Sequence, residues 1–312
     1  VYADATQGWI PLDDDVVAQA ASPPPTYKGI FAYGYNGSPL SMSNLVSSSG
    51  VIAADVSGVG TARYGPGAAG YGFDKAIFGY GDSGSRVSMT NLVSNSGVVA
   101  ADVTGVGTAR INLGAATYGG DKVIFAYGHN GSIYVSMSNL VNNSGVVGTD
   151  VTGVGTARAT MGSAEYGGTK AIFGFGSTGS AVSMTNLVTS AGVVGTDVTG
   201  VGTARQVTAS RYGGDKAIFG YGDSGSPYYN VSNLCSNTGV VSTDVSGVGT
   251  ARRNLGSTDY GGDKAIFAYG YNGTAYVSMS NLVSNSGVVA ADVSGVGTVR
   301  GYVGGAGYSS SA

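Results

Sequence analysis

One unit of 46 to 48 residues recurs six times along this chain, and this repeat limits the folds that the chain can adopt. Each copy has an apolar segment that starts at a lysine and a later segment that reads Gly-Val-Gly-Thr-Ala-Arg or a close variant. The recurring lysines are Lys28, Lys75, Lys122, Lys170, Lys216 and Lys264. The recurring arginines are Arg63, Arg110, Arg158, Arg205, Arg252 and Arg300. The copies together fill residues 28–308.

Each copy is expected to form four short strands. Segments such as Lys216–Tyr221 and Val98–Val103 are rich in apolar and β-forming residues and are bounded by Gly and Ser. Both alternating faces of 217–221 are apolar, which indicates burial on both sides of the sheet. Four strands in a unit of this length are typical of a β-propeller blade, whereas a solenoid coil is shorter and an immunoglobulin-like domain is longer. The prediction is an all-β, six-bladed β-propeller over residues 28–312.

The order of the segments also predicts how the two ends of the propeller meet. The first copy begins at Lys28 without a preceding Arg segment, and the last Arg segment, Arg300–Tyr308, has no Lys segment after it. We expect the Arg–Tyr strand to be innermost, followed by the Lys strand, the Asn-Leu-Val strand and the Val-Val strand. One blade would then join three strands from residues 28–57 to one strand from residues 300–308, which removes the open edges of the array.

Composition excludes several classes of function. The 312 residues carry a net charge of −3, and only 11% of them are charged, so the chain has no basic surface for nucleic acid or an anionic membrane. No apolar run is long enough to insert into a bilayer, and no signal-peptide pattern is present at Val1. The only cysteine is Cys235, the only histidine His129 and the only glutamate Glu165. We therefore expect no disulfide framework, no metal site, no cofactor and no catalytic residues.

Two recurring patterns have a structural and a functional interpretation. Gly79–Gly84 fits a G-x-G-x-x-G motif, but a strand pattern follows it rather than a helix, so a glycine-rich hairpin is expected instead of a dinucleotide site. An aspartate recurs eight residues before each repeated arginine, and we expect it to accept turn amides or to pair with arginine. The alternative is an arginine ring at one mouth of the central channel that holds an anion. The recurring aspartates are Asp55, Asp102, Asp150, Asp197, Asp244 and Asp292.

Function is expected where the copies differ, which is most of all in the loops between the second and third strands of each blade. These loops share one face of an up-and-down propeller, and their tyrosine and aspartate side chains suit a glycan or a protein on a cell surface. The alternative is that they are ordinary polar turns. The candidate ligand-binding residues are Tyr35, Asp82, Arg86, His129, Tyr134, Asp223, Tyr228, Tyr229, Tyr271 and Tyr276. Blades six and one adjoin after closure, so Tyr35, Tyr271 and Tyr276 should cluster at the seam.

The repeats resemble known sequence families in two ways. The strand order is similar to that of kelch repeats, although the fourth strand has no Trp. A closer resemblance, to tandem repeats of bacteriophage tail-fibre and virion structural proteins, lies in Tyr212-Gly-Gly-Asp-Lys-Ala-Ile-Phe-Gly-Tyr-Gly222, in Asn91-Leu-Val-Ser-Asn-Ser-Gly-Val-Val99 and in Gly105-Val-Gly-Thr-Ala-Arg110. The segment Gly8–Val16 looks like the acidic connector of such fibres. This resemblance implies a virion or fibre component in an extracellular location.

Residues 1–27 differ in composition from the repeats. The acidic run Asp13–Asp15 and the run Ser22-Pro-Pro-Pro25 predict an extended linker. A docking segment is the alternative, with Trp9 and Ile10 contacting other virion or fibre proteins. The whole sequence is therefore interpreted as a non-enzymatic fibre protein that presents a propeller for binding to a host-surface glycan or protein. Alternatives are a structural spacer or decoration protein without a ligand and, less favoured, a carbohydrate-active enzyme.

Overall fold

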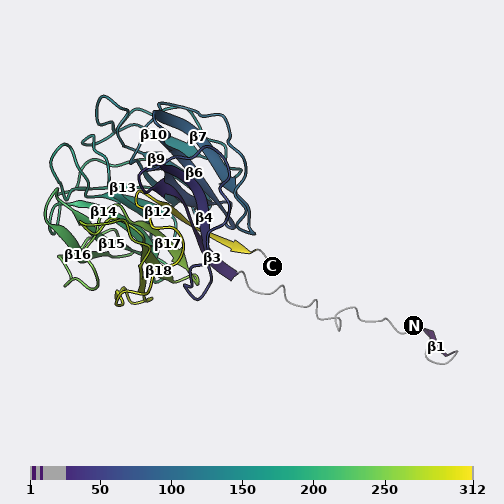
Figure 1. Cartoon of the computed structure of the whole chain (residues 1–312). Coiled ribbons are helices and arrows are strands. Elements are labelled where there is room, and N and C mark those ends of the chain that lie inside the picture. The colour runs from purple at the N-terminus through teal and green to yellow at the C-terminus, as the bar shows by residue number, and fades with distance from the viewer. Residues whose placement is uncertain (1, 5–7, 10–25, 311–312) are drawn as a thin grey trace.

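The computed structural model of the chain describes residues 2–4, 8–9 and 26–310, and within them every regular element is a β-strand (Figure 1). Six three-stranded antiparallel sheets form a β-propeller-like array of repeated sheets. A separate two-stranded pairing joins β1 (Tyr2–Asp4) to β2 (Gly8–Trp9). No part of the chain that the structure describes forms a helix with the length and apolar character of a membrane span.

Each sheet takes its inner strand from the end of one repeat and its other two strands from the start of the next, and the last repeat supplies the inner strand of the sheet that joins the two ends of the array. The first strand named for each sheet is called its inner strand here. The sheets are β20 (Gly304–Ser310), β3 (Thr26–Tyr35) and β4 (Pro39–Val46); β5 (Gly67–Tyr71), β6 (Lys75–Asp82) and β7 (Arg86–Val93); β8 (Gly114–Tyr118), β9 (Lys122–Ala126) and β10 (Ser138–Val141); β11 (Gly162–Tyr166), β12 (Lys170–Gly174) and β13 (Thr185–Val188); β14 (Gln206–Tyr212), β15 (Lys216–Asp223) and β16 (Tyr228–Cys235); β17 (Gly256–Tyr260), β18 (Lys264–Ala268) and β19 (Ser280–Val283).

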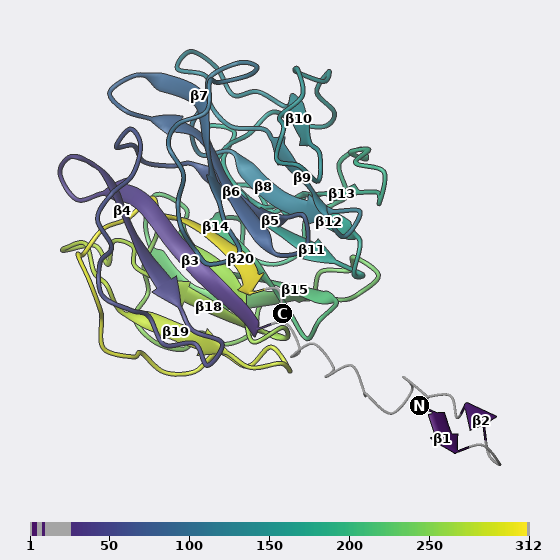
Figure 2. The same ribbon diagram turned by 90° about the vertical axis from the view of Figure 1, so that its right-hand side faces the viewer.

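The predicted pairing of the two ends of the repeat array is present. Strand β20 lies antiparallel to β3, with Tyr308 opposite Lys28 and Gly304 opposite Ala32 (Figure 2). The pairing continues beyond the predicted boundary to Ser310 and Thr26, so β3 begins two residues before the first repeated lysine. Within the predicted linker or docking segment, residues 1, 5–7 and 10–25, which include Ile10, the acidic run and the proline run, lie outside the described residues.

The inner strands contact one another in a cycle. Strand β5 contacts β8, β8 contacts β11, β11 contacts β14, β14 contacts β17, β17 contacts β20, and β20 contacts β5. A backbone hydrogen bond also joins each sheet to the next at one end of these strands. The donor amides and acceptor carbonyls are Gly72 to Asp121, Gly119 to Thr169, Gly167 to Asp215, Gly213 to Asp263, Gly261 to Tyr27, and Ser309 to Asp74.

The prediction of a regular fourth strand in each sheet is wrong. In the second repeat the Val-Val segment contacts β7 only through isolated bridges, Val99 to Val93 and Val103 to Thr90. Between the bridges, the side-chain amide of Asn91 donates to the carbonyl of Ala100 and to the carboxylate of Asp102, at 2.9 Å each. This side chain takes the place of ladder hydrogen bonds, so the backbone cannot pair continuously there. Each sheet therefore has three regular strands and an irregular outer segment.

The apolar core lies between neighbouring sheets. One cluster combines Phe31 and Val303 with Tyr260, Ile266 and other residues of the adjacent sheet, so the sheet that joins the chain ends shares a core with its neighbour. The repeated phenylalanines also explain the small residues of the inner strands. A Cβ atom added at Gly114 would lie 2.6 Å from the ring of Phe173, which leaves no room for a side chain.

The repeated arginines join the sheets to one another, and the alternative of an anion-binding arginine ring is wrong. All six side chains are fully buried. The guanidinium of Arg300 lies 4.2 Å from the ring centroid of Tyr269 in one sheet. In the next sheet, the same group donates to the carbonyl of Tyr33 at 3.0 Å and to the side chain of Asn44 at 2.6 Å. With its donors directed at protein acceptors and its face on an aromatic ring, this guanidinium is not available to a ligand in the channel.

Candidate functional site

The structure brings together three of the candidate tyrosines at the place where the two chain ends meet. The ring of Tyr35, at the end of β3, lies 6.1 Å from the ring of Tyr276, measured between centroids. Tyr276 in turn lies 5.3 Å from Tyr271, and both follow β18 in the neighbouring sheet. Residues almost at opposite ends of the repeat array therefore form one surface, as expected for the seam.

Three further tyrosines and an arginine extend this surface. Tyr64 lies 5.1 Å from Tyr35, and Tyr302 lies 5.6 Å from Tyr64. At the other end Tyr228 lies 6.3 Å from Tyr271, and the guanidinium of Arg253 lies 5.3 Å and 5.5 Å from the rings of Tyr228 and Tyr271. The six rings are called the tyrosine patch here, and they are Tyr35, Tyr64, Tyr228, Tyr271, Tyr276 and Tyr302. Each of them is partly exposed.

A buried carboxylate holds Arg253 above the tyrosine patch. Asp223 is buried at the end of β15, and its Oδ2 lies 3.3 Å from Nη1 of Arg253. Partial burial alone would lower the pKa of Arg253, but Asp223 raises it above its ordinary value, so the guanidinium stays charged. Asp223 thus positions a neighbouring side chain. It does not face outward as an acceptor for a ligand, although the sequence analysis suggested that role.

The remaining candidate residues lie in other loops and contact one another. Asp82 is buried, forms an ion pair with Arg86 and accepts the amide of Gly84 at 2.7 Å. His129 and Tyr134 pack edge to face with centroids 5.0 Å apart, and Nδ1 of His129 accepts the amide of Gly131. These contacts stabilise hairpin loops. The hydroxyl of Tyr229 lies 3.3 Å from that of Ser224 in its own loop.

The sequence contained a signal for Tyr64 that the loop comparison missed. The residue directly after each repeated arginine differs in every copy, although the arginine itself never changes. These residues are Tyr64, Ile111, Ala159, Gln206, Arg253 and Gly301. This variable position lies beside an invariant one and pairs with residues of the variable loops, so it adds to the differences between the copies on that face. Tyr64 and Arg253 occupy this position, and Tyr302 occupies the position after it, so the loop comparison identified only part of the patch.

No protein-family model matches this sequence, and a search of curated proteins gives no match.

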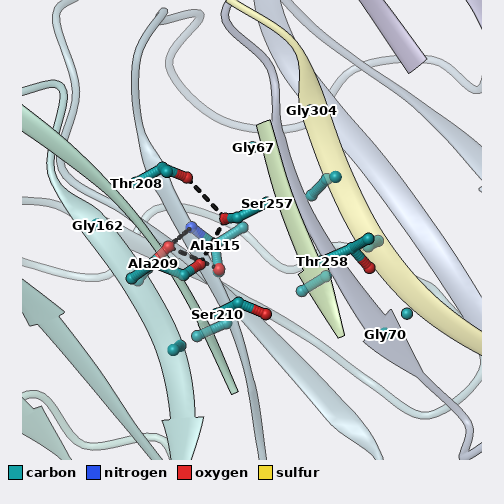
Figure 3. A pocket seen from close by; sticks show the side chains of 18 of the residues that line it. Gly67, Gly70, Ala115, Gly162, Thr208, Ala209, Ser210, Ser257, Thr258 and Gly304 are labelled. Atoms are coloured by element: carbon teal, nitrogen blue, oxygen red, sulfur yellow. Dashed lines mark hydrogen bonds between the residues drawn. The ribbon is translucent and has the colours of Figure 1, made fainter. Parts of the chain in front are cut away.

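A second candidate site is a cavity of about 340 Å³ lined by the inner strands of all six sheets (Figure 3). Small side chains and backbone form much of its wall, and hydroxyl groups cross from one inner strand to the next. The hydroxyls of Thr208 and Ser257 lie 2.6 Å apart, and Ser257 donates to the carbonyl of Ala209 at 2.7 Å. Tyr302 lines this cavity and belongs to the tyrosine patch, so the two sites adjoin.

One layer of this cavity carries charge. It consists of the residue that precedes the repeated tyrosine in each inner strand, and these six equivalent residues are Gly70, Thr117, Glu165, Arg211, Asp259 and Gly307. Nη1 of Arg211 lies 3.2 Å from Oε2 of Glu165, and its Nη2 lies 2.8 Å from Oδ2 of Asp259. The three charged side chains come from three consecutive sheets, so they form a continuous network across the wall.

Burial sets the protonation of Glu165. The side chain is only 10% exposed, and burial raises the pKa of its carboxyl to about 7, although Arg211 lowers it and Asp259 raises it further. Asp259 in turn raises the pKa of Arg211 above its ordinary value. The network therefore keeps a permanent cation beside one carboxyl that titrates near neutral pH. Within the described residues no group of three or more metal-ligating His, Cys, Asp or Glu side chains is present.

Proposed function

We propose that the chain forms a closed six-bladed β-propeller that acts as a non-enzymatic binding module. Closure is supported by the β20–β3 pairing, by the cycle of inner-strand contacts and by the backbone hydrogen bonds that link each sheet to the next. The irregular outer segment is the fourth element of each blade. The assignment of this module to a phage-type fibre or virion rests on the sequence resemblance of the repeats.

The tyrosine patch is the observation that carries the binding proposal. Six partly exposed rings lie in one continuous series, and a charged guanidinium is held against two of them. Tyrosine rings supply rigid apolar area together with hydroxyl groups, and this combination suits sugar rings and protein surfaces. The patch stands on variable positions over an unchanging framework, which is how binding surfaces are built on rigid scaffolds. The proposed ligand is a glycan or a protein of a host cell surface.

The test is the double substitution Tyr271→Ala and Tyr276→Ala. These partly exposed loop residues contribute little to the core, so the change in unfolding free energy should stay near 0.5 kcal/mol for each. Attachment of the purified protein to host cells and to a glycan array should fall at least tenfold. Tyr134→Ala is the matched control, because Tyr134 also packs on a neighbouring ring in a hairpin loop, yet lies outside the patch.

Equal attachment by the double variant and the wild-type protein, at equal concentration and with equal melting temperatures, would contradict the proposal. The interpretation as a spacer without a ligand would then be favoured. Cleavage of a labelled polysaccharide by the wild-type protein would contradict the non-enzymatic part of the proposal separately.

A further inference from the structure

Two neighbouring inner strands add no side chain to the charged layer of the axial cavity, because each has a glycine there. Glu165, Arg211 and Asp259 stand on β11, β14 and β17, while the equivalent positions on β20 and β5 are Gly307 and Gly70. A Cβ atom at Gly307 would lie 2.3 Å from Oδ1 of Asp259. The carboxylate of Asp259 therefore occupies space that a side chain on β20 would otherwise fill.

The charges of this layer do not balance. The guanidinium of Arg211 forms ion pairs with both carboxyl groups, one through each of its terminal nitrogens. The other charged residue that lines the cavity, Lys75, pairs with Asp74 at 3.1 Å and adds no net charge. With Glu165 ionised, the layer carries an uncompensated negative charge in a partly buried place, which is unfavourable without a counter-ion. A proton on Glu165 relieves this, and a bound cation would also relieve it.

An exposed aromatic residue marks the same end of the cavity. Phe73 lines the cavity, is 77% exposed and has a φ of 69°, a conformation that a bulky side chain rarely adopts. The corresponding residues of four other repeats are Gly120, Gly168, Gly214 and Gly262. Glycine would adopt this conformation without strain, so Phe73 is retained at an energetic cost. Tyr27, which is 39% exposed, also lines the cavity and contributes a second ring.

We propose that the axial cavity binds a small primary amine, with its ammonium group at the carboxylates of Glu165 and Asp259 and its entry past the rings of Phe73 and Tyr27. Carboxylates and aromatic faces are the groups that attract an organic cation. The volume of about 340 Å³ is within the range of small-ligand pockets. An anion is disfavoured because Arg211 already holds two carboxylates. A divalent metal is disfavoured because it needs more oxygen ligands than this layer offers.

The experiment is isothermal titration of the full chain with butylamine, and with butan-1-ol as a neutral analogue of equal size. Saturable millimolar binding is expected for the amine, with at least tenfold weaker binding for the alcohol. Near pH 7 amine binding should release a fraction of a proton from Glu165, so the measured heat should depend on the ionisation enthalpy of the buffer. Asp259→Asn should weaken amine binding at least tenfold and leave binding of the alcohol unchanged.

A second variant keeps the test decisive if Asp259→Asn unfolds. Phe73→Gly restores the residue of the other repeats and removes backbone strain, so it should preserve or raise the melting temperature while weakening amine binding several-fold. Equal binding of butylamine and butan-1-ol, or amine binding that neither substitution alters, would overturn the proposal. So would the absence of saturable binding by the folded protein at millimolar butylamine. These outcomes are independent of the tyrosine patch, which neither substitution touches.

Discussion

The hydroxyl of Thr298 donates a 2.6 Å hydrogen bond to the carboxylate of Asp55, although the two residues are 243 positions apart in the chain. The backbone amide of Thr298 donates to the same carboxylate, and so does the side chain of Asn44. The same arrangement joins Thr61 to Asp102 and Thr108 to Asp150 over much shorter separations. The joint between the chain ends is therefore chemically the same as the joints within the array.

The first prediction concerns this repeated joint. Asp150→Ala should lower the free energy of unfolding by about 1–3 kcal/mol, because the amide and hydroxyl of Thr108 lose their acceptor and the side chain of Asn139 loses one of its two acceptors. Denaturant unfolding measures the change. Asp215→Ala is the control, since Asp215 forms an exposed ion pair with Lys216 and should contribute less than about 1 kcal/mol. An Asp150→Ala protein that unfolds like the wild type but loses ligand binding would contradict this structural role.

The second prediction is the response of these joints to acid. Burial alone would raise the pKa of Asp102, but hydrogen bonds from Thr61 and Asn91 lower it below its ordinary value, with a smaller contribution from Arg63. A carboxyl with a lowered pKa stabilises the folded protein above its unfolded-state pKa, and this contribution is lost as the pH falls through the folded-state pKa. Protonation of these carboxyl groups should therefore lower the free energy of unfolding only below about pH 4.

Unfolding curves recorded from neutral pH down to about pH 2 test this response. Asp102→Asn removes one titrating group, so its stability should change less with acid than that of the wild type. A variant that loses as much stability in acid as the wild type would show that other groups control the acid transition.

The third prediction concerns the shared sheet. Deleting residues 300–312 removes β20 and leaves one edge of β3 unpaired. It also removes Ala306 and Tyr308 from the core cluster that they share with Ile30 and Phe78. The truncated protein should melt at a lower temperature and over a broader range than the full chain. A melting curve identical to that of the full chain would be incompatible with a ring closed by this strand.

The fourth prediction concerns Cys235. Its side chain is fully buried, and burial raises the pKa of the thiol to about 12. The equivalent residues of the other repeats are Val46, Val93, Val141, Val188 and Val283. Cys235→Val should therefore change the unfolding free energy by less than about 1.5 kcal/mol. An aromatic disulfide reagent should label the wild-type thiol only after unfolding, and rapid labelling of the native protein at neutral pH would contradict the buried position.

The framework of the fold was predictable because it is repeated. The predicted strand Lys216–Tyr221 lies within β15, and the predicted pairing of Arg300–Tyr308 with the first lysine strand is present from Gly304 onward, where β20 begins. An apolar segment that recurs in six copies indicates burial more reliably than a single segment does. The irregular outer segment was not predictable from strand propensity, because a side-chain amide of Asn91 replaces the ladder there.

The candidate sites were predictable only in part. The clustering of Tyr35 with Tyr276 follows from the order of the repeats, since it needs only that the last unit adjoins the first. The charged layer of the cavity was missed, because which residue of an inner strand faces the axis depends on strand register. Glu165 was noted only as the single glutamate of the chain, and its alignment with Arg211 and Asp259 in neighbouring copies was the signal that would have revealed the layer.

The sheet formed by β20, β3 and β4 has a consequence for how the protein matures in the cell. Translation produces β3 and β4 before the strands of the other five sheets, and β20 after them, so β3 has no inner neighbour until those five sheets have been made. Domains usually fold from the amino end as they emerge, but here the first sheet is the last to be completed. During that interval one edge of β3 is a template for unwanted pairing with other nascent chains. Slow or interrupted synthesis should therefore promote aggregation of this protein more than of a chain whose sheets are each completed as they are made.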